Sequence, residues 1–136
     1  MPAQKAMILA MMAAARDVRE KAYAPYSNFK VGAAVRGESG KVYLGCNVEN
    51  VSSGLTVCAE RVAIQNAISE GERAISAVVV VAGRNEISRP CGACLQVMRE
   101  FAPPNETLVI AACSLDGSYD TFTLDDYLPM PFSLPD

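Results

Sequence analysis

The stretch TVCAERVA, residues 56–63, places a cysteine, a glutamate and an arginine within four positions of one another. Apolar residues follow at helical spacing as far as Gly71, so the stretch predicts a helix over residues 56–70. Cys58 then lies at the helix N-terminus, where the partial positive charge of the helix favours thiolate over thiol. The sequence has no histidine, which excludes a Cys-His pair and a His-containing zinc site.

A second stretch, RPCGACLQV at residues 89–97, supplies two more cysteines at the start of another predicted helix. Cys91 and Cys94 are three residues apart and therefore share a helix face. Three thiolates suit Zn²⁺, and a catalytic zinc site keeps its fourth position open for water, whereas a structural site is closed. Two other interpretations remain open, namely buried structural cysteines and a structural zinc site that Cys46 or Cys113 completes.

The two charged residues after Cys58 fit the catalytic interpretation. Arg61 lies on the same helix face as Cys58, so its guanidinium can donate hydrogen bonds to the thiolates and offset their negative charge. Glu60, in the first turn, can reach over the helix end without being a ligand. There it can take a proton from water and deliver it to a leaving nitrogen. The alternative is that both are ordinary surface charges.

The remaining chain predicts helices and strands in the order α-β-β-α-β-α-β-β-α. The predicted helices cover residues 3–22, 56–70, 91–101 and a short segment from 125, and the predicted strands cover 29–35, 41–48, 75–83, 107–114 and 119–124. A turn at residues 37–40 joins the first two strands into a hairpin. This order predicts one α/β domain over residues 1–136, with a mixed sheet of about five strands covered by helices.

Composition narrows the class of partner and compartment. About half of the 136 residues are apolar and the net charge is −3, which argues against binding to DNA or RNA polymers but not against a nucleoside. The apolar N-terminal run continues into an amphipathic helix, so we read it as a helix rather than a signal peptide. No run approaches the roughly 18 apolar residues of a membrane span. We therefore expect a cytoplasmic protein, whose odd number of cysteines favours metal binding over disulfides.

The motifs CAE and PCGAC resemble the signature of the zinc-dependent nucleoside and nucleobase deaminases. The segments YAPYSNFKVGAAV, GCNVEN, GLTVCAERVA, PCGACLQVMREF and LDDYLPMPF, taken in this order, resemble the small homotetrameric cytidine deaminases with three cysteine ligands. The resemblance covers residues 6–132. It implies the three-layer α-β-α fold of that family and the hydrolytic deamination of cytidine and deoxycytidine to uridine and deoxyuridine, as in pyrimidine salvage.

The same resemblance implies a role for individual residues and for a second subunit. At the metal it implies one Zn²⁺ per subunit on Cys58, Cys91 and Cys94, proton transfer by Glu60 and contact of Arg61 with the thiolates. For the nucleoside it implies binding of the ribose 3′-hydroxyl by Asn47 and Glu49, and base contacts from Phe29 and the Ala59 backbone. It also implies that a neighbouring subunit inserts Phe132 into the pocket. The expected assembly is a homotetramer with shared pockets. Asn47 and Glu49 could instead cap a loop, Phe29 could belong to the core only, and Phe132 could anchor the tail.

Two alternative functions remain open beside the main prediction. One is a deaminase of another aminopyrimidine nucleoside such as blasticidin S, and the other is a non-catalytic, zinc-stabilised binding or scaffold protein; an editing enzyme of polynucleotides is disfavoured by the acidic, short chain. Three positions depart from the family pattern: Ser53, Arg89 and Leu95, where tyrosine, a small residue and arginine are commoner. One hypothesis is that Arg89 supplies the charge missing at position 95.

Overall fold

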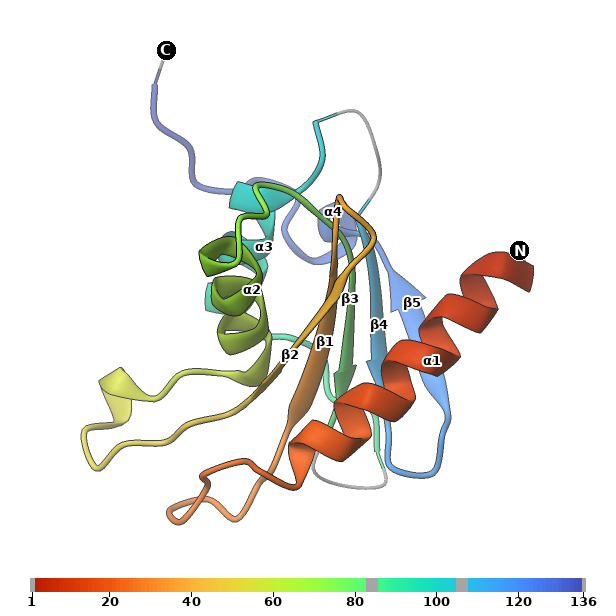
Figure 1. Cartoon of the computed structure of the whole chain (residues 1–136). Coiled ribbons are helices and arrows are strands. Elements are labelled where there is room, and N and C mark those ends of the chain that lie inside the picture. The colour runs from red at the N-terminus through yellow and green to blue at the C-terminus, as the bar shows by residue number, and fades with distance from the viewer. Residues whose placement is uncertain (1, 83–85, 105–107, 136) are drawn as a thin grey trace.

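A computed structural model describes residues 2–82, 86–104 and 108–135 of the chain. A mixed five-stranded sheet lies between helices on both of its faces (Figure 1). The elements are α1 (Pro2–Arg19), β1 (Gly32–Gly37), β2 (Val42–Cys46), the 3-10 helix η1 (Ser53–Leu55), α2 (Ala59–Ser69), β3 (Ile75–Val81), α3 (Gly92–Phe101), β4 (Val109–Cys113), β5 (Tyr119–Phe122) and α4 (Leu124–Tyr127). The predicted α/β class and the predicted order of helices and strands are confirmed.

The strands are arranged in the order β2-β1-β3-β4-β5. The β1–β2 hairpin is antiparallel, and β1 pairs antiparallel with β3. β3 and β4 are parallel and β5 returns antiparallel to β4. Parallel neighbours need a crossover, and α3 provides it. The carboxyl end of β3 therefore lies at the same edge of the sheet as the start of α3.

Each face of the sheet carries its own hydrophobic cluster. Residues of β3 alternate between faces, so Val78 and Val80 join the cluster beneath α2 and α3, whereas Val79 and Val81 join the cluster beneath α1. In Figure 1, α1 crosses one face of the sheet while α2 and α3 cover the other. The resulting three-layer α-β-α arrangement agrees with the fold that the sequence predicts.

Helix α2 lies unusually close to β2 because of a glycine. A Cβ atom built on Gly45 would lie 2.3 Å from the backbone nitrogen of Ala63 and 2.8 Å from the carbonyl oxygen of Ala59. These distances are shorter than any tolerated contact, so only glycine permits this approach. The position of α2, and of the residues at its N-terminus, thus depends on an absent side chain.

A buried carboxylate holds the turn of the β1–β2 hairpin. Glu72 accepts hydrogen bonds from the hydroxyl and backbone N–H of Ser39 and from the Tyr43 hydroxyl, the last at 2.8 Å. The bonds from Ser39 and then Tyr43 lower the pKa of the Glu72 carboxyl below its ordinary value. Glu72 is only 8% exposed, and its ionised form is therefore stabilised by neighbouring donors rather than by water.

Several predicted boundaries differ from the structure. Helix α1 ends at Arg19 instead of residue 22, because residues 20 and 21 form a turn. β1 begins at Gly32 instead of residue 29, and the 3-10 helix η1 was not predicted. The predicted strands over 75–83 and 107–114 extend to residues outside the described part of the chain. Among the described residues, no helix has the length and apolarity that a bilayer span requires.

Candidate active site and metal centre

Three cysteines converge where the N-termini of α2 and α3 meet. Cys58 is the N-cap residue of α2, Cys91 is the N-cap residue of α3, and Cys94 lies one turn further along α3. Their sulfur atoms all lie within 4.8 Å of one another. Tetrahedral zinc with Zn–S bonds of about 2.3 Å places its thiolates roughly 3.8 Å apart, so the cluster has the chemistry and the dimensions of a zinc site.

The backbone of the two N-cap residues explains how the sulfurs reach the same place. Cys58 and Cys91 both have extended conformations, with φ/ψ of −70°/153° and −74°/168°. Within the described structure neither side chain makes a capping hydrogen bond to its helix, so each sulfur remains available to a ligand. Exposure is graded across the cluster: Cys94 is buried, Cys58 is half-buried and Cys91 is exposed.

Arg61 lies beside the cluster and balances its charge. Its Nη2 donates a hydrogen bond to Cys58 Sγ at 3.4 Å and another to the Thr56 carbonyl oxygen at 3.5 Å. The hydrogen bond from the Cys94 thiol, followed by that from Arg61, lowers the pKa of Cys58, whereas donation to Cys58 raises the pKa of Cys94. Cys58 therefore ionises more readily than Cys94, and the guanidinium stabilises that charge.

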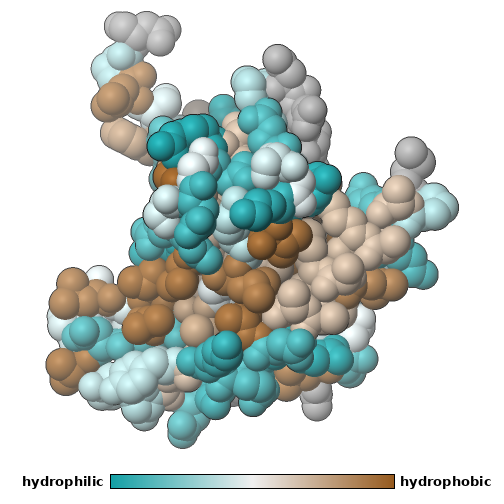
Figure 2. Space-filling view, in the orientation of Figure 1, coloured by the Kyte–Doolittle hydropathy of each residue, from teal (hydrophilic) through white to brown (hydrophobic). Residues whose placement is uncertain are grey.

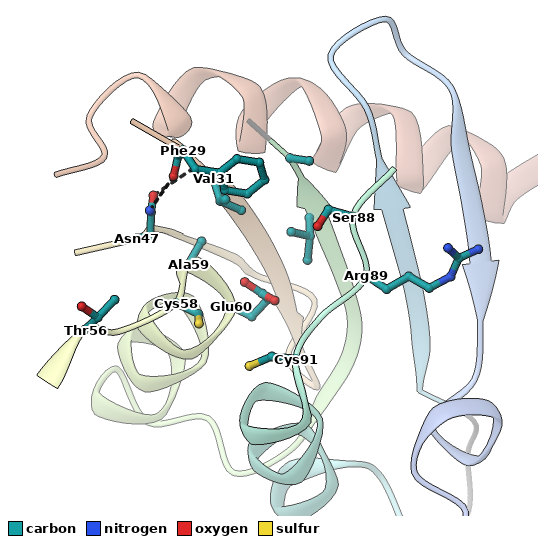
Figure 3. A pocket seen from close by; sticks show the side chains of 12 residues that line it. Phe29, Val31, Asn47, Thr56, Cys58, Ala59, Glu60, Ser88, Arg89 and Cys91 are labelled. Atoms are coloured by element: carbon teal, nitrogen blue, oxygen red, sulfur yellow. Dashed lines mark hydrogen bonds between the residues drawn. The ribbon is translucent and has the colours of Figure 1, made fainter. Parts of the chain in front are cut away.

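Glu60 is buried next to the thiols although it carries a carboxyl group. It is 5% exposed, and burial raises its pKa to about 7. The position in the first turn of α2 directs its side chain into the pocket, as Figure 3 shows. A carboxyl group with a pKa near neutrality can both accept and release a proton under physiological conditions.

The thiols and Glu60 form one end of a pocket of about 240 Å³. The surface of its lining is mainly apolar. Its apolar residues are Phe29, Val31, Ala59, Val80 and Ala82, and its polar residues are Asn47, Thr56, Cys58, Glu60, Ser88, Arg89 and Cys91. Figure 3 shows the Phe29 ring and the Val31 side chain at the end of the pocket away from the sulfurs of Cys58 and Cys91. The pocket lies at the carboxyl end of β3, an edge at which open α/β sheets commonly bind ligands.

The polar residues of the sequence motif NVEN hold the pocket together. Asn47 Oδ1 accepts a hydrogen bond from the Val31 N–H at 2.9 Å, and its Nδ2 donates to the Phe29 carbonyl oxygen at 2.8 Å. Glu49 accepts hydrogen bonds from the backbone N–H groups of Tyr26 and Ser27 at 3.0 and 3.2 Å. Asn47 thus fixes the strand-like segment that carries Phe29, and Glu49 holds the preceding turn.

The structure brings most of the predicted site residues together. Phe29, Asn47, Cys58, Ala59, Glu60 and Cys91 line the pocket, and Cys94 and Arg61 adjoin it. Glu49 and Phe132 lie outside the lining. The Phe132 side chain is 75% exposed, and its carbonyl oxygen accepts a hydrogen bond from Gln96 at 3.1 Å.

The two remaining cysteines lie apart from the metal-binding cluster. Cys113 is in β4 on the α1 face of the sheet, and burial raises its pKa to about 12. Cys46 is half-exposed in β2. Neither belongs to the group of ligand atoms that are close enough to share an ion among the described residues. A structural site with a fourth thiolate therefore has no support in this part of the chain.

Five residues of the pocket wall were not predicted from the sequence: Val31, Thr56, Val80, Ala82 and Ser88. Their side chains carry no chemistry that a motif search detects. Position offers a partial signal, because Val80 and Ala82 lie at the carboxyl end of the most apolar predicted strand. Ser88 carries no such signal.

Comparison with known proteins agrees with this geometry. A family model described as "Cytidine and deoxycytidylate deaminase zinc-binding region" matches residues 6–111. Cytidine deaminase of Sporosarcina psychrophila is 42% identical over 126 residues, covering 93% of this chain and 91% of that protein. Cytidine deaminase of Halalkalibacterium halodurans is 44% identical over 120 residues, covering 88% and 89%.

Solved structures are similar over the same range. The crystal structure of cytidine deaminase from Burkholderia pseudomallei superposes with a TM-score of 0.84 at 47% identity, covering 90% of this chain and 97% of that one. The cytidine deaminase from Mycobacterium tuberculosis superposes with a TM-score of 0.74 at 37% identity, covering 94% and 96%. The similarity therefore includes the two cysteine stretches and the strands between them.

Proposed function

This chain belongs to the cytidine and deoxycytidylate deaminase family, and from that premise we propose that it is a zinc-dependent hydrolase that converts cytidine and deoxycytidine to uridine and deoxyuridine. The observation that carries the proposal is the position of Glu60, a buried carboxyl group that shares one pocket with a cluster of three thiols. Burying a carboxyl group costs stability, and a purely structural metal site gives no reason for that cost. Its presence beside the thiols therefore favours a catalytic role.

Cys58, Cys91 and Cys94 would hold one zinc ion. Zinc in such a site lowers the pKa of water to about 7 and so supplies a nucleophile at neutral pH. Three thiolates give the site a net negative charge, which opposes that effect. Arg61, at 3.4 Å from Cys58 Sγ, withdraws part of this charge from the metal through its hydrogen bond.

Glu60 would move the protons of the reaction. Its carboxylate takes a proton at the metal end of the pocket and delivers it to N3 of cytosine, and a second transfer protonates the departing amine. Its pKa of about 7 in the buried site suits both halves of this cycle. The oxygen of the water would become bonded to C4, and ammonia would leave as the bond between C4 and the amino nitrogen breaks, so that cytosine and water give uracil and ammonia.

The walls of the pocket would orient the nucleoside. Phe29 is proposed to offer an aromatic surface to the pyrimidine ring and the backbone of Ala59 to contact the edge of the base, which the position of both residues in the pocket lining supports. Asn47 and Glu49 are proposed to bind the ribose 3′-hydroxyl. Both already make internal hydrogen bonds, but oxygen acceptors have more than one lone pair, so they can hold a hydroxyl in addition.

The enzyme is proposed to be a homotetramer whose pockets are shared between subunits. Apolar side chains gather over β2 and the segment that carries η1 (Figure 2), and they include Val48, Val51 and Leu55, which are 43%, 83% and 65% exposed. Patches of this kind mark protein interfaces. The pocket of one subunit, about 240 Å³, is smaller than the roughly 300 Å³ of the smallest usual ligand sites. A site that a neighbouring subunit completes would account for this difference. Phe132 is the candidate for that contribution.

Two further aspects belong to the proposal. The cytoplasm is the expected compartment, because a reducing environment keeps the thiols of the cluster, of which Cys58 is half-buried and Cys91 exposed, available for metal. The substrate is a nucleoside, and neither a nucleic acid polymer nor a membrane is an expected partner of an acidic chain. Deamination of blasticidin S and a scaffold role are the less favoured alternatives.

The decisive test is a spectrophotometric assay of cytidine deamination by zinc-loaded protein beside Glu60→Gln. The variant preserves the shape of the side chain but cannot carry the proton, so we expect a loss of at least about 100-fold in kcat, the lower end of general acid–base contributions. Zinc content should stay unchanged, and the melting temperature should not fall, because glutamine removes the cost of burying an ionisable group. Equal turnover by both proteins would refute the role of Glu60, and turnover of blasticidin S in preference to cytidine would favour the alternative substrate.

A further inference from the structure

Ser88 and Arg89 form one wall of the pocket, and they belong to the segment 86–90, which leads directly into Cys91. Pro90 is buried and fixes the end of the segment next to α3. Within the described structure, the backbone of residues 86–90 makes no hydrogen bond to the rest of the protein. The wall therefore needs another anchor to keep a defined position over the pocket.

Arg89 provides that anchor. Its backbone lies at the pocket, while its side chain extends away from the pocket toward β5 (Figure 3). Nη2 donates a hydrogen bond to Asp120 Oδ2 at 3.1 Å, and the guanidinium carbon lies 5.6 Å from the centre of the Tyr127 ring. Tyr127 packs edge-on against Phe122, with the ring centres 4.8 Å apart. The side chain thus connects the wall to β5 and α4 together.

These contacts give Arg89 a different role from the charge substitution considered at the sequence level. Leu95 is 5% exposed and packs in the hydrophobic core beneath α2 and α3, so no charge is needed at that position. The Arg89 guanidinium is matched by Asp120 and not by the thiols.

We propose that Arg89 is a positioning residue, which holds the wall formed by Ser88 and Arg89 over the pocket and thereby sets the affinity for the nucleoside. This inference rests on the proposed function. If the wall covers the pocket in only a fraction of the molecules, the apparent affinity for the nucleoside equals the affinity of the complete pocket multiplied by that fraction. Loss of the link to Asp120 and Tyr127 leaves the wall free to move away and lowers the complete fraction.

The expected effect is moderate because both ends of the link are solvent-exposed, at 43% and 56% of the side-chain surface. An exposed ion pair and an exposed cation–π contact each shift an equilibrium by a factor of about two to five. Arg89→Ala removes both, so KM for cytidine should rise by up to about 4- to 25-fold while kcat changes by less than about twofold. Arg89→Lys keeps the ion pair without the planar guanidinium and should give an intermediate KM.

A double-mutant cycle tests whether Arg89 acts through its partner. Asp120→Ala should raise KM as well, and the double variant with Arg89→Ala should be no worse than Arg89→Ala. Because cytidine is uncharged, added salt should raise KM of the wild type by screening the ion pair but leave KM of Arg89→Ala unchanged. Arg99→Ala, at an exposed arginine in the last turn of α3, is the matched control and should behave like wild type.

Unchanged KM in Arg89→Ala, or a loss confined to kcat, would overturn the proposal, since reduced stability alone lowers the active fraction without altering KM. The rate of zinc release to a chromogenic chelator judges the link without any nucleoside. Cys91 follows the wall directly, so Arg89→Ala should release zinc several-fold faster than Arg99→Ala, and equal rates would overturn the proposal. A wild type that turns over no cytidine would refute the proposed function instead, leaving the release rates to decide on the link.

Discussion

Replacement of Gly45 by alanine tests how closely α2, the helix that carries Glu60, must approach the sheet. The new Cβ would lie 2.3 Å from the Ala63 nitrogen, whereas ordinary contact begins at 3.4 Å. The difference, 3.4 − 2.3 = 1.1 Å, is the distance by which α2 or β2 must give way. Both neighbours are backbone, so no side chain can rotate to relieve the clash. The helix that carries Glu60 therefore has to shift by about 1 Å.

That shift should affect both the stability of the protein and the rate of the reaction. Overpacking of this kind costs about 1–3 kcal/mol, which corresponds to a fall of about 4–12 °C in melting temperature for a domain of this size. Displacement of a catalytic group by about 1 Å lowers the rate by about 100-fold. Activity should thus fall even in protein that stays folded, because Glu60, the proposed proton carrier, and Cys58 move together with α2.

The assay compares Gly45→Ala with Gly54→Ala, where an added Cβ meets no atom within 4 Å. Calorimetry gives the melting temperature, and the deamination assay gives kcat/KM for protein of equal zinc content. Wild-type stability and activity in Gly45→Ala would refute the close approach itself. Reduced stability with unchanged kcat/KM would refute the argument that the close packing of α2 against β2 positions the site.

Three other perturbations have defined outcomes. Arg61→Gln should speed zinc release about 10-fold or more, as loss of a group that supports a metal ligand usually does, and chelator kinetics would measure this. Glu72→Gln should lower the melting temperature near neutral pH more than Tyr43→Phe does, and the difference should vanish in acid, because stabilisation by a carboxyl group with a lowered pKa is present above its ordinary pKa and lost as the pH falls through the folded value. Met11→Ala and Met98→Ala, at buried positions on opposite faces of the sheet, should each cost about 2–5 kcal/mol in urea unfolding, but only the second should weaken zinc retention.

The parts of the fold that follow a simple period were predictable from the sequence. The β-branched run at Ile75–Val81 predicts a buried strand, and the apolar spacing after Cys58 predicts a helix with one buried face. Both predictions need only the local order of apolar and polar residues. The start of β1 was not predictable in this way. Residues 29–31 alternate like a strand, but the Asn47 amide takes their hydrogen bonds, so they end outside the ladder. That contact joins residues 16 or more positions apart, which no local pattern reports.

The residues of the site likewise divide into those that the sequence predicts and those that it does not. Thiols at two helix N-termini and a carboxylate two residues from one of them have a chemical signature, and the structure places Cys58, Cys91 and Cys94 together. The apolar walls have none, because valine and alanine occur throughout the core. Glu49 shows a further limit: the sequence suggests a role in sugar binding and also a role in the loop, and its bonds to residues 26 and 27 show the second role while leaving the first a proposal.

The division of the core into two clusters explains how one small domain combines a stable sheet with a reactive site. Cys94 belongs to the cluster beneath α2 and α3, so the innermost thiol is packed like a core residue. The cluster beneath α1 includes Cys113 but no residue of the pocket. The α1 face can therefore stabilise the sheet without constraining the chemistry. On the other face, packing and metal binding are coupled, because the sulfurs keep their mutual distances only while both helices stay seated on the sheet.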